Sequence, residues 1–326
     1  MSASFRVTVL VGGIGGARFL KGLRLIPNLE ISVIVNSGDD IWMHGLRICP
    51  DLDSVIYNLA GASDLVRGWG RGDETWTIQE ELANYLGERP WFNLGDKDFA
   101  THIYRTELLS QGVKLNEIVA AQCARWGIAQ KILPSTNEWV ETQVHLTQVH
   151  DGKTALHFQE WWVRYRAALP AVGFELTGKD IAKPAPGVLE AIHGADVILF
   201  APSNPIVSTG MILQVAGIRE ALVESSAPIV GVSPIIGGNP VLGMADKCLT
   251  ALNLETSATS VATLYGSRSH GGLLNGWLIA DSDSQQVEGI EKLGMACQAI
   301  PLLMSDDLVT QTMAEAAIEL AQSVSN

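Results

Sequence analysis

The segment FRVTVLVGGIGGARFLKGLRLIPNLEISVIV (residues 5–35) decides the fold class of this chain. It opens with FRVTVLV, an apolar and β-branched run that predicts a strand, and continues into GGIGG, which predicts a tight turn. Residues 17–26 carry apolar side chains at helical spacing, and ISVIV at 31–35 predicts a second strand. A strand, a helix and a strand joined by loops this short imply a parallel sheet.

Strand and helix patterns alternate again in the second half of the chain. Buried strands are expected at ADVILF (195–200) and APIVG (227–231). Helices are expected at 209–223 and 241–253, and a closing helix beyond residue 305. We therefore predict an α/β fold, in which residues 1–72 and 181–326 form a Rossmann-like, doubly wound and mainly parallel sheet.

Residues 73–180 have a different pattern. Three amphipathic helices are expected, at 77–86, 100–112 and 115–127. Alternation of polar and apolar residues at 140–149 and 153–163, on either side of the turn HDGK, predicts a β-hairpin. We interpret 73–180 as an inserted subdomain of helices plus a β-hairpin.

Composition limits the class of protein. The chain has 326 residues, of which 47% are hydrophobic and 17% charged, which is enough for a substantial core. Its net charge of −13 would repel a phosphate backbone, so we expect no nucleic-acid partner. The four cysteines are scattered without a CxxC pair, which indicates reduced thiols. No signal peptide and no apolar run of ~18 residues is evident, so we expect a cytoplasmic protein without a membrane span.

The GGIGG turn would bring backbone N–H groups close to an anion at the start of the first helix. The glycines concerned are Gly12, Gly13, Gly15 and Gly16. The turn is not a dinucleotide fingerprint, because Arg18 stands where the third glycine of that motif belongs, and no GK[ST] follows as in a P-loop. Arg18 and Lys21, one turn apart, favour a phosphate or similar anion over the alternative of a turn that serves packing alone.

Acidic residues follow the second strand. Asp39 and Asp40 end it, and Asp51 and Asp53 come after a short loop. Asp51 or Asp53 could simply cap a helix that starts near residue 52, but four carboxylates within fifteen residues exceed what capping needs. Oxygen ligands without paired His or Cys suit Mg²⁺ or Mn²⁺ bridging carboxylates to substrate phosphates.

Further polar loops lie at 94–98 and 201–209. In LGDKD, Asp96 and Asp98 could cap the following helix, and Lys97 could reach a phosphate or ring oxygen. Small hydroxyl and amide groups follow the strand ADVILF and could bind phosphate or a nucleobase edge, with helix capping as the alternative. These are Ser203, Asn204, Ser208 and Thr209, and Ser233 is a weaker case of the same kind.

Two histidines and an aromatic run complete the candidates. His44 and His102 each lie beside an acidic loop, although a lone histidine is more often structural. Trp161, Trp162 and Tyr165 could form the wall for a flat heterocycle or serve as hairpin core. No GxSxG motif is present, so a nucleophilic triad is not indicated.

Taken together, these loops resemble, in order along the chain, the blocks of the 2-phospho-L-lactate transferase family, which acts in biosynthesis of the deazaflavin coenzyme F420. The blocks are GGIGGARFLKGL, VNSGDDIWMHGLRICPDLDSVIYNLAG, GWGRGDETW, WFNLGDKDFATHIYRTELL, ILPSTNEWVET, LHFQEWWVRYRA, APSNPIVSTG and PIVGVSPIIGGNPVLGMADK. They cover nearly the whole chain, and GDDIWMHGLRICPDLD, DETW and EWWVRYRA are most similar to the actinobacterial, phosphoenolpyruvate-type branch.

The resemblance implies a reaction. The family moves a three-carbon acid phosphate from a guanosine diphosphate-activated donor to the terminal ribityl hydroxyl of the deazaflavin Fo, releasing GMP. The group is phosphoenolpyruvyl in the actinobacterial branch and 2-phospho-L-lactyl in archaea, and the sequence does not distinguish the two. The resemblance also implies Mg²⁺ as cofactor, and a homodimer is our default expectation.

The resemblance assigns roles to residues. It implies Asp40, Asp51 and Asp53 at the metal and acceptor hydroxyl, with Asp51 and Asp53 catalytic and Asp51 favoured as base. The implied substrate contacts are Gly12, Gly13, Gly15 and Gly16 in the cleft; Asp96, Lys97 and Asp98 towards Fo or the diphosphate; and Ser203, Asn204 and Ser208 on the guanosine side. We also expect Asn36, His44 and Ser233 to contact substrate. Many relatives have GGTGT where this chain has GGIGG, so no threonine contact carries over to Ile14.

Two other functions fit parts of the sequence. A non-catalytic nucleotide-sugar sensor of the same superfamily would share the glycine loop and an SNP-like motif, but the blocks PDLD and LGDKDFATH are associated with the transferase branch. A Rossmann oxidoreductase is suggested by the first strand–turn–helix alone.

Overall fold

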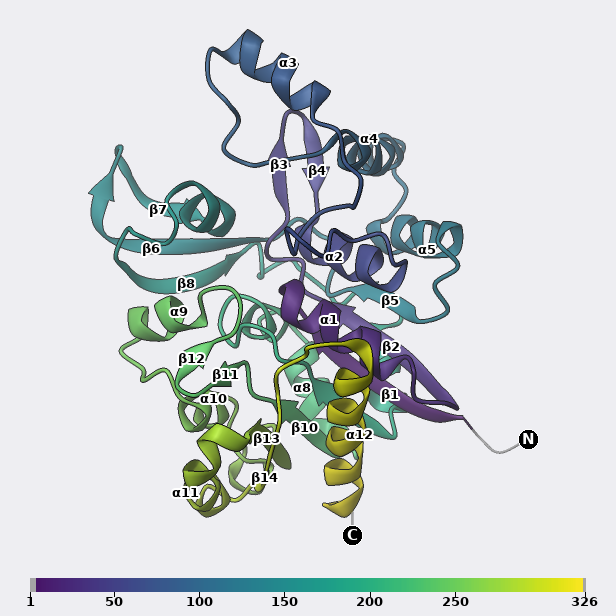
Figure 1. The fold of residues 1–326 in the computed structure, drawn as a ribbon, viewed down its shortest axis with the longest axis vertical. Coiled ribbons are helices and arrows are strands. Elements are labelled where there is room, and N and C mark those ends of the chain that lie inside the picture. Colours follow the sequence, from purple (N-terminus) through teal and green to yellow (C-terminus); the bar gives the residue numbers. More distant parts are fainter. Residues whose placement is uncertain (1–3, 325–326) are drawn as a thin grey trace.

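The computed structural model describes residues 4–324, so the ends of the predicted core segments 1–72 and 181–326 lie outside the described residues. Seven strands form a central sheet in the order β14-β13-β10-β9-β1-β2-β5, and every neighbouring pair is parallel. Their bounds are β1 Phe5–Val11, β2 Leu29–Val35, β5 Lys131–Pro134, β9 Val197–Phe200, β10 Ile229–Val232, β13 Gly276–Ala280 and β14 Ala296–Ile300. The α/β prediction is confirmed (Figure 1).

Helices cover both faces of this sheet. Side chains of β1 alternate between the faces: Val9 packs in the cluster that includes α1 and α12, whereas Leu10 packs in the cluster that includes α6 and α8. The helices are α1 Gly13–Leu23, α2 Pro50–Leu59, α3 Thr77–Leu86, α4 Asp96–Ser110, α5 Leu115–Arg125, α6 Val188–Gly194, α7 Thr209–Ile212, α8 Ile218–Glu224, α9 Ala245–Ala251, α10 Ala258–Tyr265, α11 Val287–Lys292 and α12 Asp307–Ser323. The doubly wound arrangement predicted from the sequence is therefore present.

Three small sheets accompany the central one. A three-stranded sheet, β7-β6-β8, stands apart beside the core in Figure 1, and two short hairpins, β3-β4 and β11-β12, extend from loops. Their bounds are β3 Ile41–Met43, β4 Leu46–Ile48, β6 Glu141–His150, β7 Lys153–His157, β8 Ala171–Thr177, β11 Ile235–Ile236 and β12 Asn239–Pro240. The predicted hairpin around HDGK is confirmed, and β8 joins it as a third strand.

Several predicted elements differ in extent. The strand expected to run to residue 163 ends at His157, and a π-helix, η1 (Glu160–Arg164), follows it. The single helix expected at 209–223 is two short helices, because the chain turns at Gly217 with a φ of 94°. Within the predicted insertion 73–180, strand β5 pairs with β2 at the edge of the central sheet. That segment therefore contributes to the core as well as to the subdomain.

No helix among residues 4–324 combines the length and apolar character needed to cross a membrane. Cys49, Cys123, Cys248 and Cys297 are all free thiols, as their scattered positions predict.

Candidate active site

A cavity of about 770 Å³ opens at the carboxyl edge of the central sheet. The loops that follow β1, β2, β9 and β10 meet there, because neighbouring parallel strands end at the same edge. The first turns of α2 and α4 and the segment around η1 complete its wall. Of the residues expected to bind metal or contact substrate, ten line it: Gly12, Gly13, Gly15, Asp51, Asp53, Asp98, Ser203, Asn204, Ser208 and Ser233.

The glycine loop belongs to helix α1 itself, which begins at Gly13, where φ is 65°. A Cβ at Gly15 would lie 2.5 Å from the carbonyl oxygen of Pro202, and one at Gly16 would lie 2.6 Å from Ser203 Oγ. The backbone N–H of Gly12 donates to Ser203 Oγ at 3.0 Å. Glycine is thus needed for close packing against the 201–205 loop as well as for access to the cavity, and Gly16 is buried in that packing.

Asp39 and Asp51 form a carboxylate pair in the cavity wall. Asn36 Nδ2 donates to Asp39 Oδ1 and to Asp51 Oδ2, each at 3.0 Å, and Gln159 Nε2 donates to Asp39 Oδ2 at 3.1 Å. Burial, with the neighbouring charge of Asp51, raises the pKa of Asp39 well above its usual value. Burial raises the pKa of Asp51 to about 6, against the opposing effects of Asn36 and the backbone of Gly13. Two adjacent, buried carboxylates form a site that a cation would stabilise.

Asn36 therefore orients the carboxylates. Its side chain is buried, and its Oδ1 accepts from the backbone N–H of Gly38 at 2.9 Å. Asn36 does not line the cavity, where a substrate contact was predicted; its side chain holds Asp39 and Asp51, which do line it.

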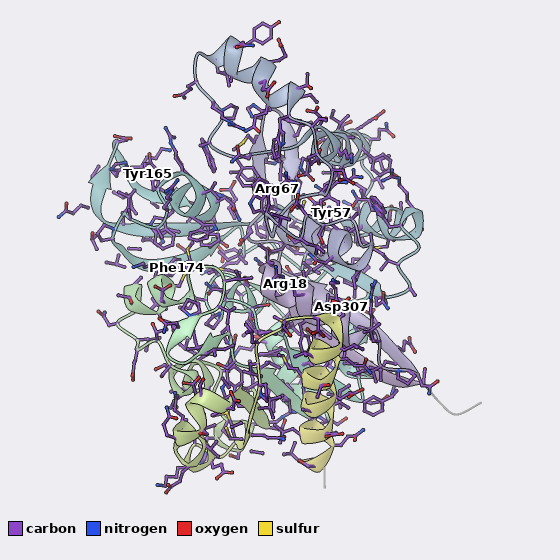
Figure 2. All side chains as sticks on the ribbon, in the orientation of Figure 1. Arg18, Tyr57, Arg67, Tyr165, Phe174 and Asp307 are labelled. Atoms are coloured by element: carbon purple, nitrogen blue, oxygen red, sulfur yellow. The ribbon has the colours of Figure 1, made fainter. Side chains whose placement is uncertain are left out.

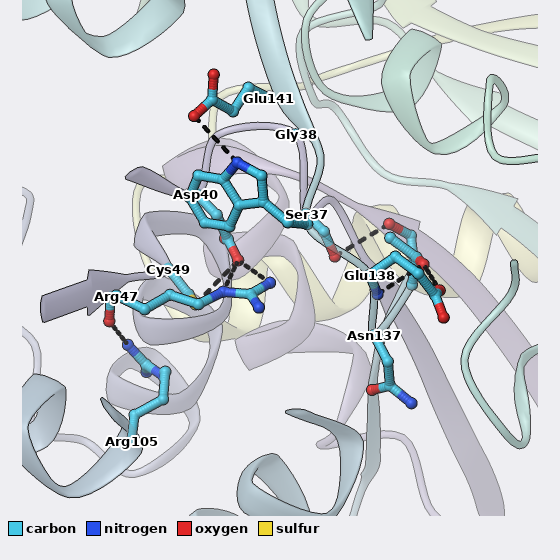
Figure 3. A network of polar contacts seen from close by, with 12 residues as sticks. Ser37, Gly38, Asp40, Arg47, Cys49, Arg105, Asn137, Glu138 and Glu141 are labelled. Atoms are coloured by element: carbon cyan, nitrogen blue, oxygen red, sulfur yellow. Dashed lines mark hydrogen bonds and ion pairs between the residues drawn. The ribbon is translucent and has the colours of Figure 1, made fainter. Parts of the chain in front are cut away.

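Asp40, adjacent to Asp39, points away from the cavity. Its Oδ2 accepts from Arg47 Nη2 at 2.9 Å and from Cys49 Sγ at 3.0 Å, and Figure 3 shows this cluster with Arg105 beyond Arg47. Both members of the ion pair are buried. Asp40 is therefore held by Arg47 and does not line the cavity, so this arrangement gives no support to its predicted metal-binding role.

Asp53 is also paired. Both of its carboxylate oxygens accept from Arg105, whose side chain is 0% exposed, and Arg105 Nη1 also donates to the carbonyl oxygen of Arg47 at 3.2 Å. His102 Nδ1 lies 3.7 Å from Asp53 Oδ2, and burial lowers the pKa of this histidine to about 4, so the ring is neutral at pH 7. Asp53 lines the cavity as half of a buried ion pair.

The set of Asp40, Asp51 and Asp53 predicted for the metal is not assembled. Within residues 4–324 no three acidic, histidine or cysteine side chains are placed to hold one metal ion together. Arg47 and Arg105 engage two of the three predicted ligands, so Asp51 is the one of the three that has no ion pair in the described structure.

Asp98 lies on the first turn of α4 and lines the cavity. Burial raises its pKa to about 7, and the nearby charge of Asp53 adds to the shift. The other two residues of the predicted LGDKD contact lie elsewhere. Asp96 accepts from the backbone N–H groups of Thr77 and Ile78 at 3.1 and 2.9 Å, which ties α4 to the start of α3.

Lys97 and His44 were also predicted to contact substrate, and the structure places both outside the cavity lining. Lys97 Nζ donates to the carbonyl oxygen of Gly72 at 3.2 Å, and the residue does not line the cavity. His44 lies in the turn between β3 and β4 with a φ of 53°, where its ring packs beside that of Phe99. Neither residue lines the cavity: Lys97 lies in the first turn of α4, and His44 lies in the turn between β3 and β4.

Some of the polar residues predicted to contact substrate after β9 and β10 hold their own loops instead. Asn204 Oδ1 accepts from the backbone N–H groups of Ile206 and Val207 at 2.9 and 3.2 Å, so this side chain shapes its own turn. Ser233 Oγ accepts from the backbone N–H of Ile235 at 3.1 Å in the same manner. Ser208 has no capping hydrogen bond to α7 and lines the cavity beside Gly12.

The cavity is also lined by basic and aromatic side chains, two of which, Arg18 and Trp162, were candidates from the sequence. Arg18 projects from α1 near the centre of the molecule, and Tyr57 from the neighbouring helix α2 (Figure 2). Of the aromatic run, Trp162 lines the cavity, whereas Trp161 is buried in the core and donates from Nε1 to the carbonyl oxygen of Leu169 at 2.7 Å. Arg166 lines the cavity without having been singled out, because no periodic pattern marks the end of a π-helix.

Comparison with known proteins places the chain in a family. A family model described as "2-phospho-L-lactate transferase CofD" matches residues 7–298. The "Phosphoenolpyruvate transferase" of Nocardia farcinica is 50% identical over 319 residues, covering 97% of this chain and 95% of the relative. That of Streptomyces griseus is 52% identical over 321 residues, covering 98% and 99%.

A solved structure shares the fold. A UPF0052 family protein of Bacillus halodurans matches with a TM-score of 0.61 at 19% identity, covering 96% of this chain and 99% of that one. Because the family model spans most of the sequence and relatives near half identity span nearly all of it, this chain belongs to the CofD family of 2-phospho-L-lactate transferases.

Proposed function

We propose that this chain transfers a phosphoenolpyruvyl group from a guanosine diphosphate-linked donor to the terminal ribityl hydroxyl of the deazaflavin Fo, releasing GMP. The observation that carries the proposal is the nearly full-length similarity to two proteins named phosphoenolpyruvate transferase. The reaction forms a bond between the hydroxyl oxygen and the phosphorus that bears the enolpyruvyl group. It breaks the bond from that phosphorus to the oxygen of GMP, and the hydroxyl proton is lost.

The carboxylate pair in the cavity wall is suited to bind a divalent cation. Asp39 and Asp51 are buried carboxylates that share one amide donor, and burial raises the pKa of both. We propose that these two hold Mg²⁺, which would neutralise the donor diphosphate when bound. Two carboxylates suffice, since Mg²⁺ commonly completes its shell with substrate phosphates and water.

The chain's own groups have distinct roles in this proposal. Asn36 and Gln159 orient the carboxylate pair through their amide hydrogens. The first turn of α1 presents backbone N–H groups to the diphosphate, as helix N-termini favour anions, and Arg18 from the second turn adds a cation. Phosphoryl-type transfer depends mainly on such positioning and charge neutralisation, so the chain needs no covalent nucleophile.

The test is incubation of the pure protein with Fo, Mg²⁺ and either the enolpyruvyl or the lactyl form of the guanosine diphosphate donor. We expect a deazaflavin joined through a phosphodiester, detected by mass spectrometry, and GMP in equal amount. A chelator should abolish both products. Absence of the product with either donor would refute the proposal, and tight binding of a UDP-sugar without affinity for Fo would favour the sensor instead. A cytoplasmic homodimer completes the proposal.

A further inference from the structure

The segment from Gln159 to Arg166 forms one wall of the cavity. Gln159, Trp162, Val163 and Arg166 line it, from the residue before η1 to the second residue after its end. Gln159 lies at the carboxylate pair, because its Nε2 donates to Asp39 at 3.1 Å. Arg166 lies two residues beyond the end of η1 at Arg164 and lines the same cavity. This wall therefore connects the proposed reaction centre to a guanidinium.

The backbone at Arg166 is unusual for an arginine. Arg166 and Ala167 have φ values of 51° and 53°, in the left-handed region. The N–H of Ala167 donates to the carbonyl oxygen of Trp161 at 2.9 Å, which closes the end of the helical turn. Glycine takes this position most readily in helix ends. An arginine at a strained position beside a cavity indicates that the side chain, and not the backbone, is what the site requires.

The guanidinium of Arg166 has no hydrogen-bond or ion-pair partner in the part of the chain that the structure describes. Arg164, two residues earlier, is the contrast, because its Nη1 donates to Glu160 at 2.9 Å and its guanidinium lies over the ring of Tyr165. Among the described residues that line the cavity, Arg18 and Arg166 are the cations, since the pKa of His102 is lowered to about 4.

We infer that Arg166 binds the carboxylate of the three-carbon acid on the donor and is a specificity-determining residue for the activated group. This inference rests on the proposed function. The donor carries two kinds of anion: the diphosphate, which is matched by the start of α1 and by Arg18, and a carboxylate some bonds away. A carboxylate among acidic neighbours needs a second cation, and the planar guanidinium binds a carboxylate through two parallel hydrogen bonds.

The test compares Arg166→Gly with the matched control Arg164→Gln in the full-length protein with Mg²⁺. Affinity is measured by calorimetry for three probes: the enolpyruvyl donor, GDP, which lacks the carboxylate, and Fo. For Arg166→Gly we expect affinity for the donor to fall about 10- to 100-fold, with GDP and Fo unchanged. Its melting temperature should not fall, because glycine suits the left-handed backbone. Arg164→Gln should keep wild-type affinity for all three probes.

The outcomes separate the inference from the proposed function. If the wild type turns over donor while Arg166→Gly keeps wild-type donor affinity, the inference alone is overturned. Equal loss of GDP and donor affinity would also overturn it, since Arg166 would then serve the diphosphate. Absence of wild-type turnover with either donor overturns the proposed function and the inference with it. Partial recovery of donor affinity in Arg166→Lys would support binding through charge.

Discussion

Asn36 and Asp51 are joined by a buried hydrogen bond of 3.0 Å, and the same amide nitrogen of Asn36 donates to Asp39. One neutral side chain thus holds two carboxylates side by side at the end of β2. Two carboxylates repel each other, and the amide of Asn36 offsets this repulsion by donating to both. The shared donor therefore holds Asp39 and Asp51 in place to bind a cation.

Asn36→Ala should weaken metal binding about 10- to 100-fold, because side chains that orient metal ligands typically contribute that much. Mn²⁺ titration followed by electron paramagnetic resonance measures the affinity without catalysis. Ser37→Ala is the control, since Ser37 Oγ accepts from Ser135 at 3.1 Å and does not line the cavity. Equal Mn²⁺ affinity in wild type and Asn36→Ala would contradict the role of Asn36.

Asp51→Asn should lose turnover by about 100-fold or more while keeping the fold, because it removes one carboxylate of the pair. The neutral side chain also ends the repulsion with Asp39, so the melting temperature without metal should not fall. Circular dichroism and steady-state kinetics measure the two effects. Turnover close to wild type would remove Asp51 from the mechanism.

Asp98→Asn should stabilise the metal-free protein at pH 8, and the gain should shrink towards pH 5. The folded pKa of Asp98, about 7, is above the unfolded value, so the native state takes up a proton as the pH falls through 7. The wild type therefore carries a buried charge at pH 8 that is neutral at pH 5. We expect a difference in unfolding free energy of about 2 kcal/mol at pH 8. A pH-independent difference in urea melts would contradict this assignment.

Arg105→Leu should destabilise the protein by about 3–5 kcal/mol, because it leaves the carboxylate of Asp53 buried without its partner. Adding Asp53→Asn in the same chain should recover part of the loss, since no unpaired charge then remains. Urea unfolding of both variants measures the two values. If the unfolding free energy of Arg105→Leu alone lies within about 1 kcal/mol of the wild-type value, the ion pair is dispensable for folding.

Gly15→Ala should cost about 1–3 kcal/mol, because the new Cβ would lie 2.5 Å from the carbonyl oxygen of Pro202 in a rigid loop. Gly289→Ala is the matched control: it is also a helical glycine, but its Cβ would meet no atom within 4 Å. That substitution should stabilise by about 0.5–1 kcal/mol. In thermal melts we expect Gly15→Ala to lower the melting temperature and Gly289→Ala to raise it. A higher melting temperature in Gly15→Ala would show that the 201–205 loop moves to admit the new Cβ.

Elements with a regular local sequence pattern were predicted correctly, whereas short elements and those that depend on tertiary packing were not. Helix α3 has the predicted bounds, 77–86, because its amphipathic spacing is regular and Gly87 ends it with a φ of 73°. The hairpin β3-β4 was missed, since strands of three residues are too short to show alternation. The π-helix was predicted as strand, because a run of aromatic residues suits either state until its packing is known.

The sequence by itself determined the parallel sheet, the family and the edge of the sheet where the site lies, because strand and helix periodicity and loop order are local properties. Only the tertiary structure decided which carboxylates are free. Asp39 faces Gln159, 120 residues away, whereas Asp40 faces Arg47 and Asp53 faces Arg105, 52 residues away. Neighbouring aspartates look alike in a sequence, and the charge of a buried carboxylate depends on partners that folding brings to it.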